Sequence, residues 1–328
     1  MIYSVILMAL LFALNLFVGT TSVPVADTVS VLLGLPSTDE AALVVIHSRL
    51  PEAVVALFAG GGLAVAGLVM QTLFANPLAD PSLLGVNAGA SLGVAIAMLL
   101  FGGSVAAAGV VLSGRLLLLV AAFAGAFAVM LVLMFCARLM RGRLQLLVTG
   151  VMLSFVISAV IAILSFFASA QGVQTFVVWG LGTFSGIPAA QLPLLVAGVA
   201  VGVAGILLLA KPLNALLLGE AYAQNLGVSV ASVRAALLVF AGLLSAVITA
   251  FCGPISFVGL AVPHGVYALC RTVDHRRLVP MCFLGGSCVA LCCNALARTV
   301  SDYSVLPVNT LTPLFGVPVV MALLLRGR

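Results

Sequence analysis

Phe58-Ala-Gly-Gly-Gly-Leu-Ala-Val-Ala-Gly67 is a stretch of small and apolar residues without a charge. A helix with such a face lets neighbouring helix backbones approach closely, as helices in a bilayer do. Residues 71–90 follow it and read Gln-Thr-Leu-Phe-Ala-Asn-Pro-Leu-Ala-Asp-Pro-Ser-Leu-Leu-Gly-Val-Asn-Ala-Gly-Ala. The two prolines and the repeated glycines predict a break in this helix, where bare backbone groups need protein or water partners.

The composition of the whole chain predicts an integral membrane protein. Of its 328 residues, 64% are hydrophobic and only 6% are charged, whereas a soluble domain carries roughly a quarter charged residues. A bilayer span needs about 20 apolar residues. We therefore expect an all-α polytopic membrane protein, one transmembrane domain over residues 1–328, with about ten spans. They are placed at 1–19 (an uncleaved first span, since no basic residue precedes it), 53–74, 88–111, 116–138, 144–168, 190–210, 234–252, 256–270, 278–298 and 308–325.

The basic residues fix the expected orientation. With the N-terminus inside, ten of the thirteen Lys and Arg residues fall on the inner side, as the positive-inside rule requires. The three on the outer side are Arg49, Arg115 and Arg298. The net charge of +5 is thus a signal of topology, and we expect no nucleic-acid partner. The longest outer loop is 20–52, and residues 211–233 form an inner loop.

This inner loop, here called the inner segment, is the least apolar part of the chain and carries its only lysine, Lys211. Leu218, Tyr222 and Leu226 recur at a spacing of four residues, which predicts a short helix after Gly219. Glu220 stands in its first turn, where a carboxylate favours the helix dipole, and Gly227 suits the residue that ends it. Such a segment is either an ordinary interhelical loop or a surface that a soluble partner grips.

A second break follows the seventh span, at residues 253–264, as the first break follows the second span. Matching interruptions in the two halves predict an inverted repeat. The residues expected at these helix breaks, near a transport pathway, are Asn76, Pro77, Pro81, Gly85, Gly253, Pro254, Gly259 and Pro263. For His264 we expect a helix-packing role, and for His275, next to Asp274, a solvated helix start.

Three classes of function compete for such a chain: a gradient-driven secondary transporter, a membrane-embedded enzyme, and the permease of an importer driven by a separate ATPase. The eight acidic residues map to loops or span ends, which argues against proton coupling, although backbone carbonyls could still bind sodium. An enzyme needs a convergent polar site, and no catalytic or nucleotide-binding motif occurs. The seven cysteines show no CxxC spacing, so we expect them to pack inside helices and hold no metal.

Several motifs, in order along the chain, decide between these classes. They are Arg49-Leu50-Pro51, Asn76-Pro-Leu-Ala-Asp-Pro81, Leu84-Gly85-Val86 with Gly89-Ala90, Gly219-Glu220 with Leu226-Gly227-Val228, Gly253 to His264, Asp274-His275-Arg276-Arg277, and Leu306-Pro307-Val308 with Gly316-Val317-Pro318. From about residue 45 to the C-terminus the chain resembles the FecCD-type permeases of ABC importers for iron–siderophore complexes, haem and vitamin B12.

The resemblance implies a type II ABC importer permease fold in a bacterial cytoplasmic (inner) membrane. It implies a homodimer with the pathway between the subunits, two ATPase subunits on the cytoplasmic side, and a periplasmic or lipid-anchored substrate-binding protein. The cargo would be an iron chelate, haem or cobalamin. ATP and Mg would be used by the partner, so we expect this chain to bind no cofactor and to be no enzyme itself. The residues implied in ATPase coupling are Leu218, Gly219, Glu220, Tyr222, Ala223, Leu226 and Gly227.

The resemblance also implies contacts at the two mouths of the pathway. Arg49 and Arg298 match arginines that dock the binding protein, while a third such position is Glu52 here. We therefore expect Glu52→Arg to be neutral or favourable for docking. Arg143 and Leu144 fall in the loop that narrows the cytoplasmic end, where the family has small polar residues.

Overall fold

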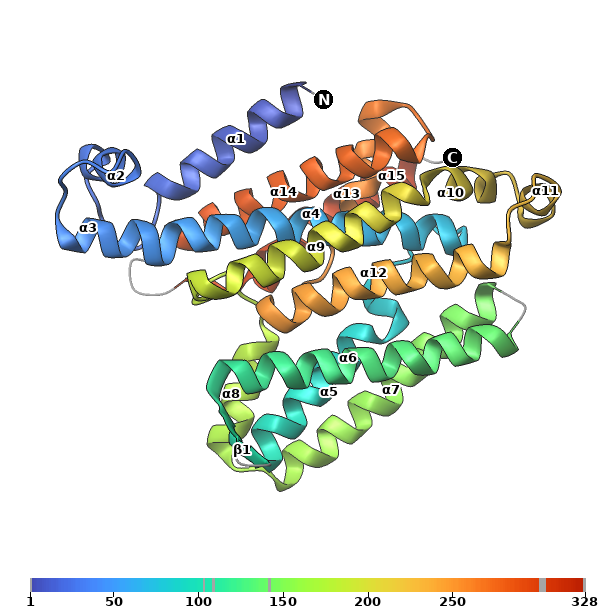
Figure 1. The fold of residues 1–328 in the computed structure, drawn as a ribbon, viewed down its shortest axis with the longest axis horizontal. Coiled ribbons are helices and arrows are strands. Elements are labelled where there is room, and N and C mark those ends of the chain that lie inside the picture. Colours follow the sequence, from blue (N-terminus) through green and yellow to red (C-terminus); the bar gives the residue numbers. More distant parts are fainter. Residues whose placement is uncertain (1, 103, 108–109, 141–142, 301–304, 327–328) are drawn as a thin grey trace.

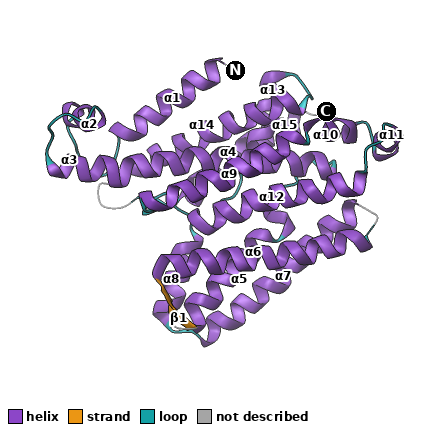
Figure 2. Ribbon diagram, viewed as in Figure 1, coloured by secondary structure: helices purple, strands orange, loops and turns teal. Residues whose placement is uncertain are grey.

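The protein is described here from a computed structural model, which covers the chain except for residues 1, 103, 108–109, 141–142, 301–304 and 327–328. The described chain is almost entirely helical, and most of its long helices lie along the longest axis of the molecule (Figures 1 and 2). The expected all-α membrane architecture is confirmed in this respect.

The central element is α4 (Leu50–Phe74), which contains the small-residue stretch quoted above. It continues α3 (Asp39–Val44) through a π-helical turn at Val45–Arg49, so that one helical rod spans Asp39–Phe74. In its most apolar window 83% of the residues are buried. Four other helices surround it: α9 (Leu192–Leu208), α12 (Val230–Cys252), α13 (Val258–Cys270) and α14 (His275–Thr299).

Glycines allow this close packing, as the sequence predicts. A Cβ added to Gly60 would lie 2.3 Å from the carbonyl oxygen of Gly286 on α14, and one added to Gly67 would lie 1.9 Å from that of Gly259 on α13. Both distances are shorter than any real Cβ contact. The backbones of α4, α13 and α14 are therefore in direct contact, which maximises dispersion attraction where no water is available to drive helices together.

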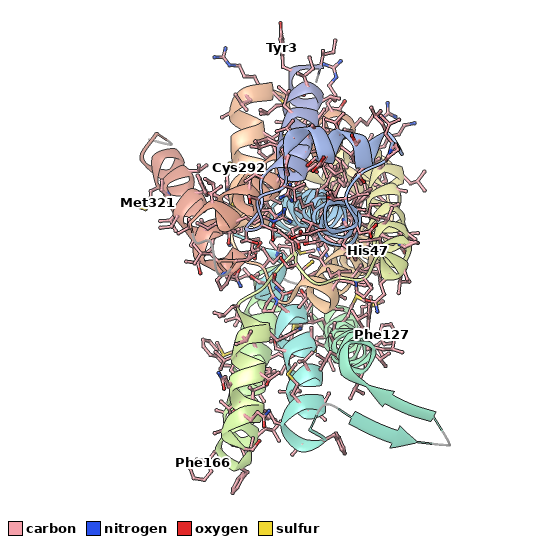
Figure 3. The ribbon with its side chains drawn as sticks, turned by 90° about the vertical axis from the view of Figure 1, so that its left-hand side faces the viewer. Tyr3, His47, Phe127, Phe166, Cys292 and Met321 are labelled. Carbon is pink, nitrogen blue, oxygen red and sulfur yellow. The ribbon has the colours of Figure 1, made fainter. Side chains whose placement is uncertain are left out.

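A second group of helices consists of α5 (Val86–Ala95), α6 (Gly114–Leu139) and α7 (Arg143–Phe167). Figure 3 shows it below the α4 group, with Phe166 of α7 at its far end. Glycines again permit contact, because a Cβ on Gly93 would meet the Ala121 carbonyl at 1.9 Å. Helix α12 packs against α4 as well as α5 and α6, and so joins the two groups.

Shorter elements complete the two ends of the molecule. They are α1 (Ile2–Phe17), α2 (Val25–Leu32), a 3₁₀ turn at Pro81–Leu84, a π-helical turn at Ile96–Leu100, β1 (Ser104–Ala107) paired antiparallel with β2 (Val110–Ser113), α8 (Ala170–Gly180), a 3₁₀ turn at Ala189–Gln191, α10 (Ala210–Leu217), α11 (Glu220–Asn225) and α15 (Val308–Arg326). The outer loop 20–52 is thus largely helical, which its polar and mixed sequence did not reveal.

Six helices of the described chain are long and apolar enough to cross a membrane, and four shorter apolar helices accompany them. Each lies within a few residues of an expected span except two. The helical rod Asp39–Phe74 begins 14 residues before the expected span 53–74, because the outer part of the rod carries polar and charged residues. The predicted span 88–111 is wrong beyond Leu100, where the helix ends and the chain turns into β1 and β2. Gly102 adopts a left-handed conformation there (φ 60°), and the valines that follow favour strands over helices.

Both predicted breaks are present. After α4, Ala75 turns into the left-handed region (φ 47°), Asn76 accepts a hydrogen bond from the Leu78 amide at 2.9 Å, and Gly85 (φ 78°) begins the path into α5. After α12, Gly253 (φ 74°) and the residues up to Phe257 separate it from α13. Pro77 and Pro81 lie inside the first break, Pro254 inside the second, and Pro263 one turn inside α13.

We predict that Gly60→Ala lowers the free energy of unfolding by roughly 1–3 kcal/mol, because the added methyl group overpacks a contact between two backbones. Thermal unfolding in detergent is the measurement. Gly265→Ala is the matched control, since a Cβ there meets no atom within 4 Å. An equal stability of the two variants would contradict the close-packing role of Gly60.

Candidate functional site

The inner segment forms the helix–glycine–helix unit that its sequence predicts. Helix α11 begins after Gly219 (φ 106°) and ends before Gly227 (φ 81°), so both glycines occupy positions that other residues rarely adopt. Ser229 precedes α12. The segment lies at the end of the molecule opposite α2 and α3 (Figure 1).

The inner segment exposes several large apolar side chains among polar ones, although it extends beyond the long helices. Leu218 is 66% exposed, Tyr222 50% and Leu226 59%, whereas Ala223 on the opposite side of α11 is fully buried. The three exposed residues are those whose spacing predicted the helix. Such a cluster is characteristic of an interaction surface rather than of a solvated loop.

An ion pair fixes the orientation of this surface. Arg234, in the first turns of α12, donates to the Glu220 carboxylate at 2.5 Å. Both side chains are partly buried. The pair joins α11 to a helix that packs directly on α4.

A second connection runs through His275, which is fully buried. Its ring nitrogens lie 2.9 Å from the Thr72 hydroxyl on α4 and 2.7 Å from the Asn214 side-chain oxygen on α10. The expectation of a solvated histidine is wrong, because α10 covers the start of α14. Asp274 does cap α14, accepting from the Arg276 amide at 3.1 Å. Hydrogen bonds from Asn214 and from that amide hold the pKa of Asp274 below its usual range.

The end of α4 and the first helix break contact α13 near the inner segment. Gln71 of α4 donates to the Leu260 carbonyl at 3.0 Å, and the His264 ring lies 2.7 Å from the Pro77 carbonyl. The predicted packing role of His264 is confirmed.

Burial raises the pKa of Asp80, which lies against Gly259, although hydrogen bonds from Ser82 act in the opposite direction. A cavity of about 300 Å³ opens between the first break, the inner segment and α13.

At the opposite end, Arg49 is only 2% exposed. It donates to the carbonyl oxygens of Leu16 at 2.9 Å, Phe17 at 3.0 Å and Thr21 at 2.5 Å. These are carbonyls at and beyond the end of α1, which the helix itself leaves without donors. Arg49 thus caps α1, a role that its sequence context did not indicate.

Arg298 is also buried, 4% exposed, and donates to the Asn15 and Val18 carbonyls at 3.2 and 3.3 Å. It also forms an ion pair with Glu52. Docking of a binding protein on Arg49 and Arg298 stays a prediction. In this chain both guanidinium groups already have intramolecular partners, which an incoming carboxylate would have to replace.

That Glu52→Arg is neutral or favourable for docking stays a prediction, but in the fold Glu52 neutralises buried Arg298, and this substitution would lose that ion pair. Ser48 donates to the other carboxylate oxygen of Glu52 at 2.9 Å. Asn294 donates to the Asn15 side chain at 2.9 Å, which extends the buried network across α1, α4 and α14. One signal in the sequence could have indicated this network. Glu52 stands three residues after Arg49, and its charge is opposite to that of Arg298.

The predicted gate residues lie at the start of α7, where Leu144 is 71% exposed. Arg143 is the first residue of this helix. Their role at the gate stays a prediction.

The fold defines a polytopic helical protein whose exposed apolar side chains on the inner segment and whose two helix breaks fit a membrane transport subunit. The chain belongs to the FecCD transport family, which matches residues 7–326. It is 37% identical over 280 residues to the vitamin B12 import system permease protein BtuC of Klebsiella pneumoniae, covering 85% of this chain and 82% of that protein.

Two further proteins show the same relationship. The BtuC protein of Escherichia coli (strain HS) is 35% identical over 291 residues, which is 89% of this chain and 86% of that protein. A solved chain, described as an inward-facing conformation of a metal-chelate type ABC transporter, superposes with a TM-score of 0.86 at 27% identity, covering 99% of this chain and 98% of the other. The function class predicted from the sequence, an ABC importer permease, is confirmed.

We predict that Glu52→Ala lowers the free energy of unfolding by about 3–5 kcal/mol, because it leaves the Arg298 charge buried without a partner. The midpoint of thermal unfolding in detergent measures the loss. Glu40→Ala, on the exposed start of α3, should change little. If both variants unfold at the same temperature, the ion pair contributes nothing to the fold.

Proposed function

We propose that this chain is the membrane permease of a binding-protein-dependent ABC importer, with two copies forming the pathway and two ATPase subunits attached to the inner segment. The observation that carries the proposal is the exposed apolar surface of Leu218, Tyr222 and Leu226, held in place by the ion pair of Glu220 with Arg234. A soluble partner must cover such a surface to remove it from water. The chain itself then needs neither a nucleotide site nor a metal.

The connection from this surface to the pathway would run through α4. Movement of α11 reaches α12 through the Glu220–Arg234 pair, and movement of α10 reaches Thr72 through Asn214 and His275. Thr72 lies within three residues of the left-handed turn at Ala75. A movement of the ATPase surface would therefore be transmitted to the membrane-spanning helices at the first helix break.

The cargo we propose is a bulky metal chelate, with cobalamin as the first candidate. Support comes from the vitamin B12 permeases among its relatives and from the metal-chelate transporter of the same fold. The acidic residues at helix ends and loops leave a pathway without strong counter-charges, which suits a large complex that must not be retained. We also propose ten spans, counting the four shorter apolar helices, an inverted repeat centred on the two breaks, and a bacterial inner-membrane location.

The experiment that tests cargo and class together is uptake into proteoliposomes containing the permease, its ATPase and its binding protein. Cobalamin, a ferric siderophore and haem are supplied in turn, with and without ATP. ATP-dependent uptake of one of them supports the importer. Uptake driven by an ion gradient without ATP would support the alternative, a gradient-driven secondary transporter.

For the coupling surface we predict that Tyr222→Ala and Leu226→Ala each weaken ATPase binding about tenfold or more, as removal of a central interface anchor does. Affinity of the purified ATPase for the permease in nanodiscs is the measurement. Leu33→Ala is the control, since Leu33 is equally exposed but lies in the outer loop.

Charge reversal at Glu220 tests separately whether the ion pair with Arg234 is needed for coupling. Glu220→Lys should uncouple ATP hydrolysis from uptake while the protein still inserts, and the exchange Glu220→Arg with Arg234→Glu should restore coupling in part. The ratio of ATP hydrolysed to cargo moved is the readout. An unchanged ratio in Glu220→Lys would show that the ion pair has no role in coupling.

For the dimer and its gate we predict that cysteines replacing Arg143 and Leu144, in a background without the seven native cysteines, crosslink across the two copies. The yield should depend on the bound nucleotide, because the cytoplasmic end of the pathway opens and closes. A cysteine replacing Leu33 is the control. Absence of crosslinks in every nucleotide state would remove both residues from the gate.

A further inference from the structure

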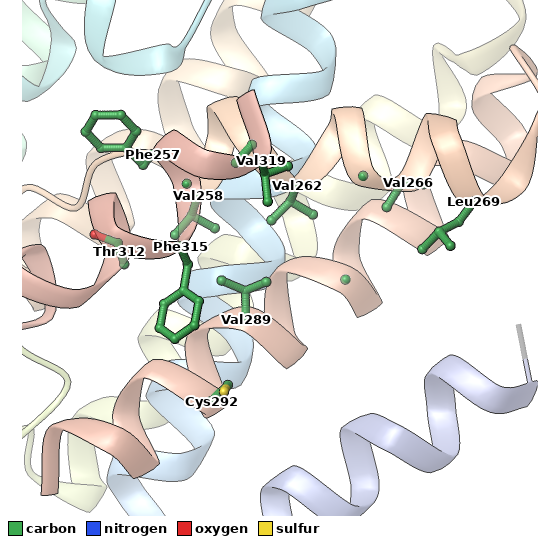
Figure 4. A pocket seen from close by; sticks show the side chains of 14 residues that line it. Phe257, Val258, Val262, Val266, Leu269, Val289, Cys292, Thr312, Phe315 and Val319 are labelled. Carbon is green, nitrogen blue, oxygen red and sulfur yellow. The ribbon is translucent and has the colours of Figure 1, made fainter. Parts of the chain in front are cut away.

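An apolar groove of about 340 Å³ runs between α13, α14 and α15. In Figure 4 its wall is formed by Val262, Val266 and Leu269 of α13 on one side and by Val289 and Phe315 on the other. Nearly every residue that lines it is apolar. Such a groove admits a hydrocarbon chain but offers little to a polar ligand.

Glycines line part of the groove and leave it open. Gly265, Gly285 and Gly316 contribute no side chain, and a Cβ added at Gly265 would meet no atom within 4 Å. The length also fits a lipid. From Val258 to Leu269 the helix rises ~17 Å, close to half of the ~30 Å hydrocarbon core, which is the depth of one leaflet.

Three basic residues follow one end of the groove in the chain. Leu269 marks that end, and Arg271 follows two residues later in a left-handed conformation (φ 48°) that ends α13. A short turn leads to Arg276 and Arg277 in the first turn of α14, and all three arginines are exposed.

This placement is unfavourable for the chain by itself. The N-terminus of a helix carries partial positive charge, so basic residues in the first turn are repelled by it. The one carboxylate of the turn, Asp274, interacts favourably with Arg276 and Arg277 and also accepts a hydrogen bond from Asn214 at 2.7 Å, so one negative charge stands against three positive ones. An anion bound beside these arginines would offset the repulsion between them and the N-terminus of α14.

We propose that the groove binds an anionic phospholipid of the cytoplasmic leaflet, with an acyl chain between α13, α14 and α15 and its phosphate on Arg271, Arg276 and Arg277. The apolar lining, the one-leaflet length and the positive end match the three parts of such a molecule. Basic sites between helices on the cytoplasmic side are suited to anionic lipid head groups. The residues that line the groove do not include Leu218, Tyr222 or Leu226.

Tryptophan fluorescence tests this site directly. The lone Trp179 is replaced (Trp179→Phe), and Phe315→Trp places an indole in the groove. The full chain is inserted into phosphatidylcholine nanodiscs containing phosphatidylglycerol or phosphatidylcholine brominated at the middle of the acyl chains. Quenching by each brominated lipid then gives the preference for the anionic lipid at that position. The control is Val201→Trp, at an exposed position on α9 outside the groove.

We expect a preference for phosphatidylglycerol of about fivefold or more at Phe315→Trp, since one basic residue near the surface contributes about that factor, and none at Val201→Trp. Combined Arg271→Gln, Arg276→Gln and Arg277→Gln should abolish the preference, whereas Lys211→Gln should leave it unchanged. Gly265→Leu should reduce quenching by both lipids, because the new side chain fills the groove.

Two results would overturn the proposal. Equal quenching by both lipids at Phe315→Trp would make the groove an ordinary lipid-facing surface. Loss of quenching by either lipid there, with Val201→Trp still quenched, would mean that a second copy of the chain covers the groove.

Discussion

Contact between glycine backbones at α4 is the constraint on which the rest of the structure depends. In a bilayer, apolar side chains gain nothing by leaving lipid for protein, so helices associate through close packing. Gly60 against Gly286 and Gly67 against Gly259 bring α14 and α13 onto α4 at distances that no side chain would allow. The position of the second break, just before α13, is set by the same contact.

Helix α4 also connects the two ends of the molecule. Its outer end carries the ion pair of Glu52 with Arg298, and its inner end carries the Thr72–His275 hydrogen bond. Polar groups at these positions are costly unless they are fully paired, so both networks fix the helices that share them. The inner network includes the start of the segment that we propose as the ATPase surface.

Much of this organisation was predictable from the sequence. Long apolar runs define most of the helices, because lipid requires each span to satisfy its own backbone groups. The inner segment was predictable because the spacing of Leu218, Tyr222 and Leu226 and the flanking glycines are local signals. The role of His275 was not, since its burial depends on Asn214, far away in the chain. Likewise Arg49 and Arg298 read as surface residues until the end of α1 is placed beside them.

The capping of α1 has a consequence for the order of assembly. Asn294 and Arg298, which bind Asn15 and the last carbonyls of α1, are synthesised about 280 residues after it. At ribosomal speeds of roughly 5–20 residues per second, this is a delay of roughly 15–60 s. During that time α1 is already in the bilayer, and so is α4, but α14, which supplies Asn294 and Arg298, is still absent. Helix α1 therefore reaches its final position only after α14 has entered the membrane. The packing of α1 against α14 is thus a late step of biogenesis.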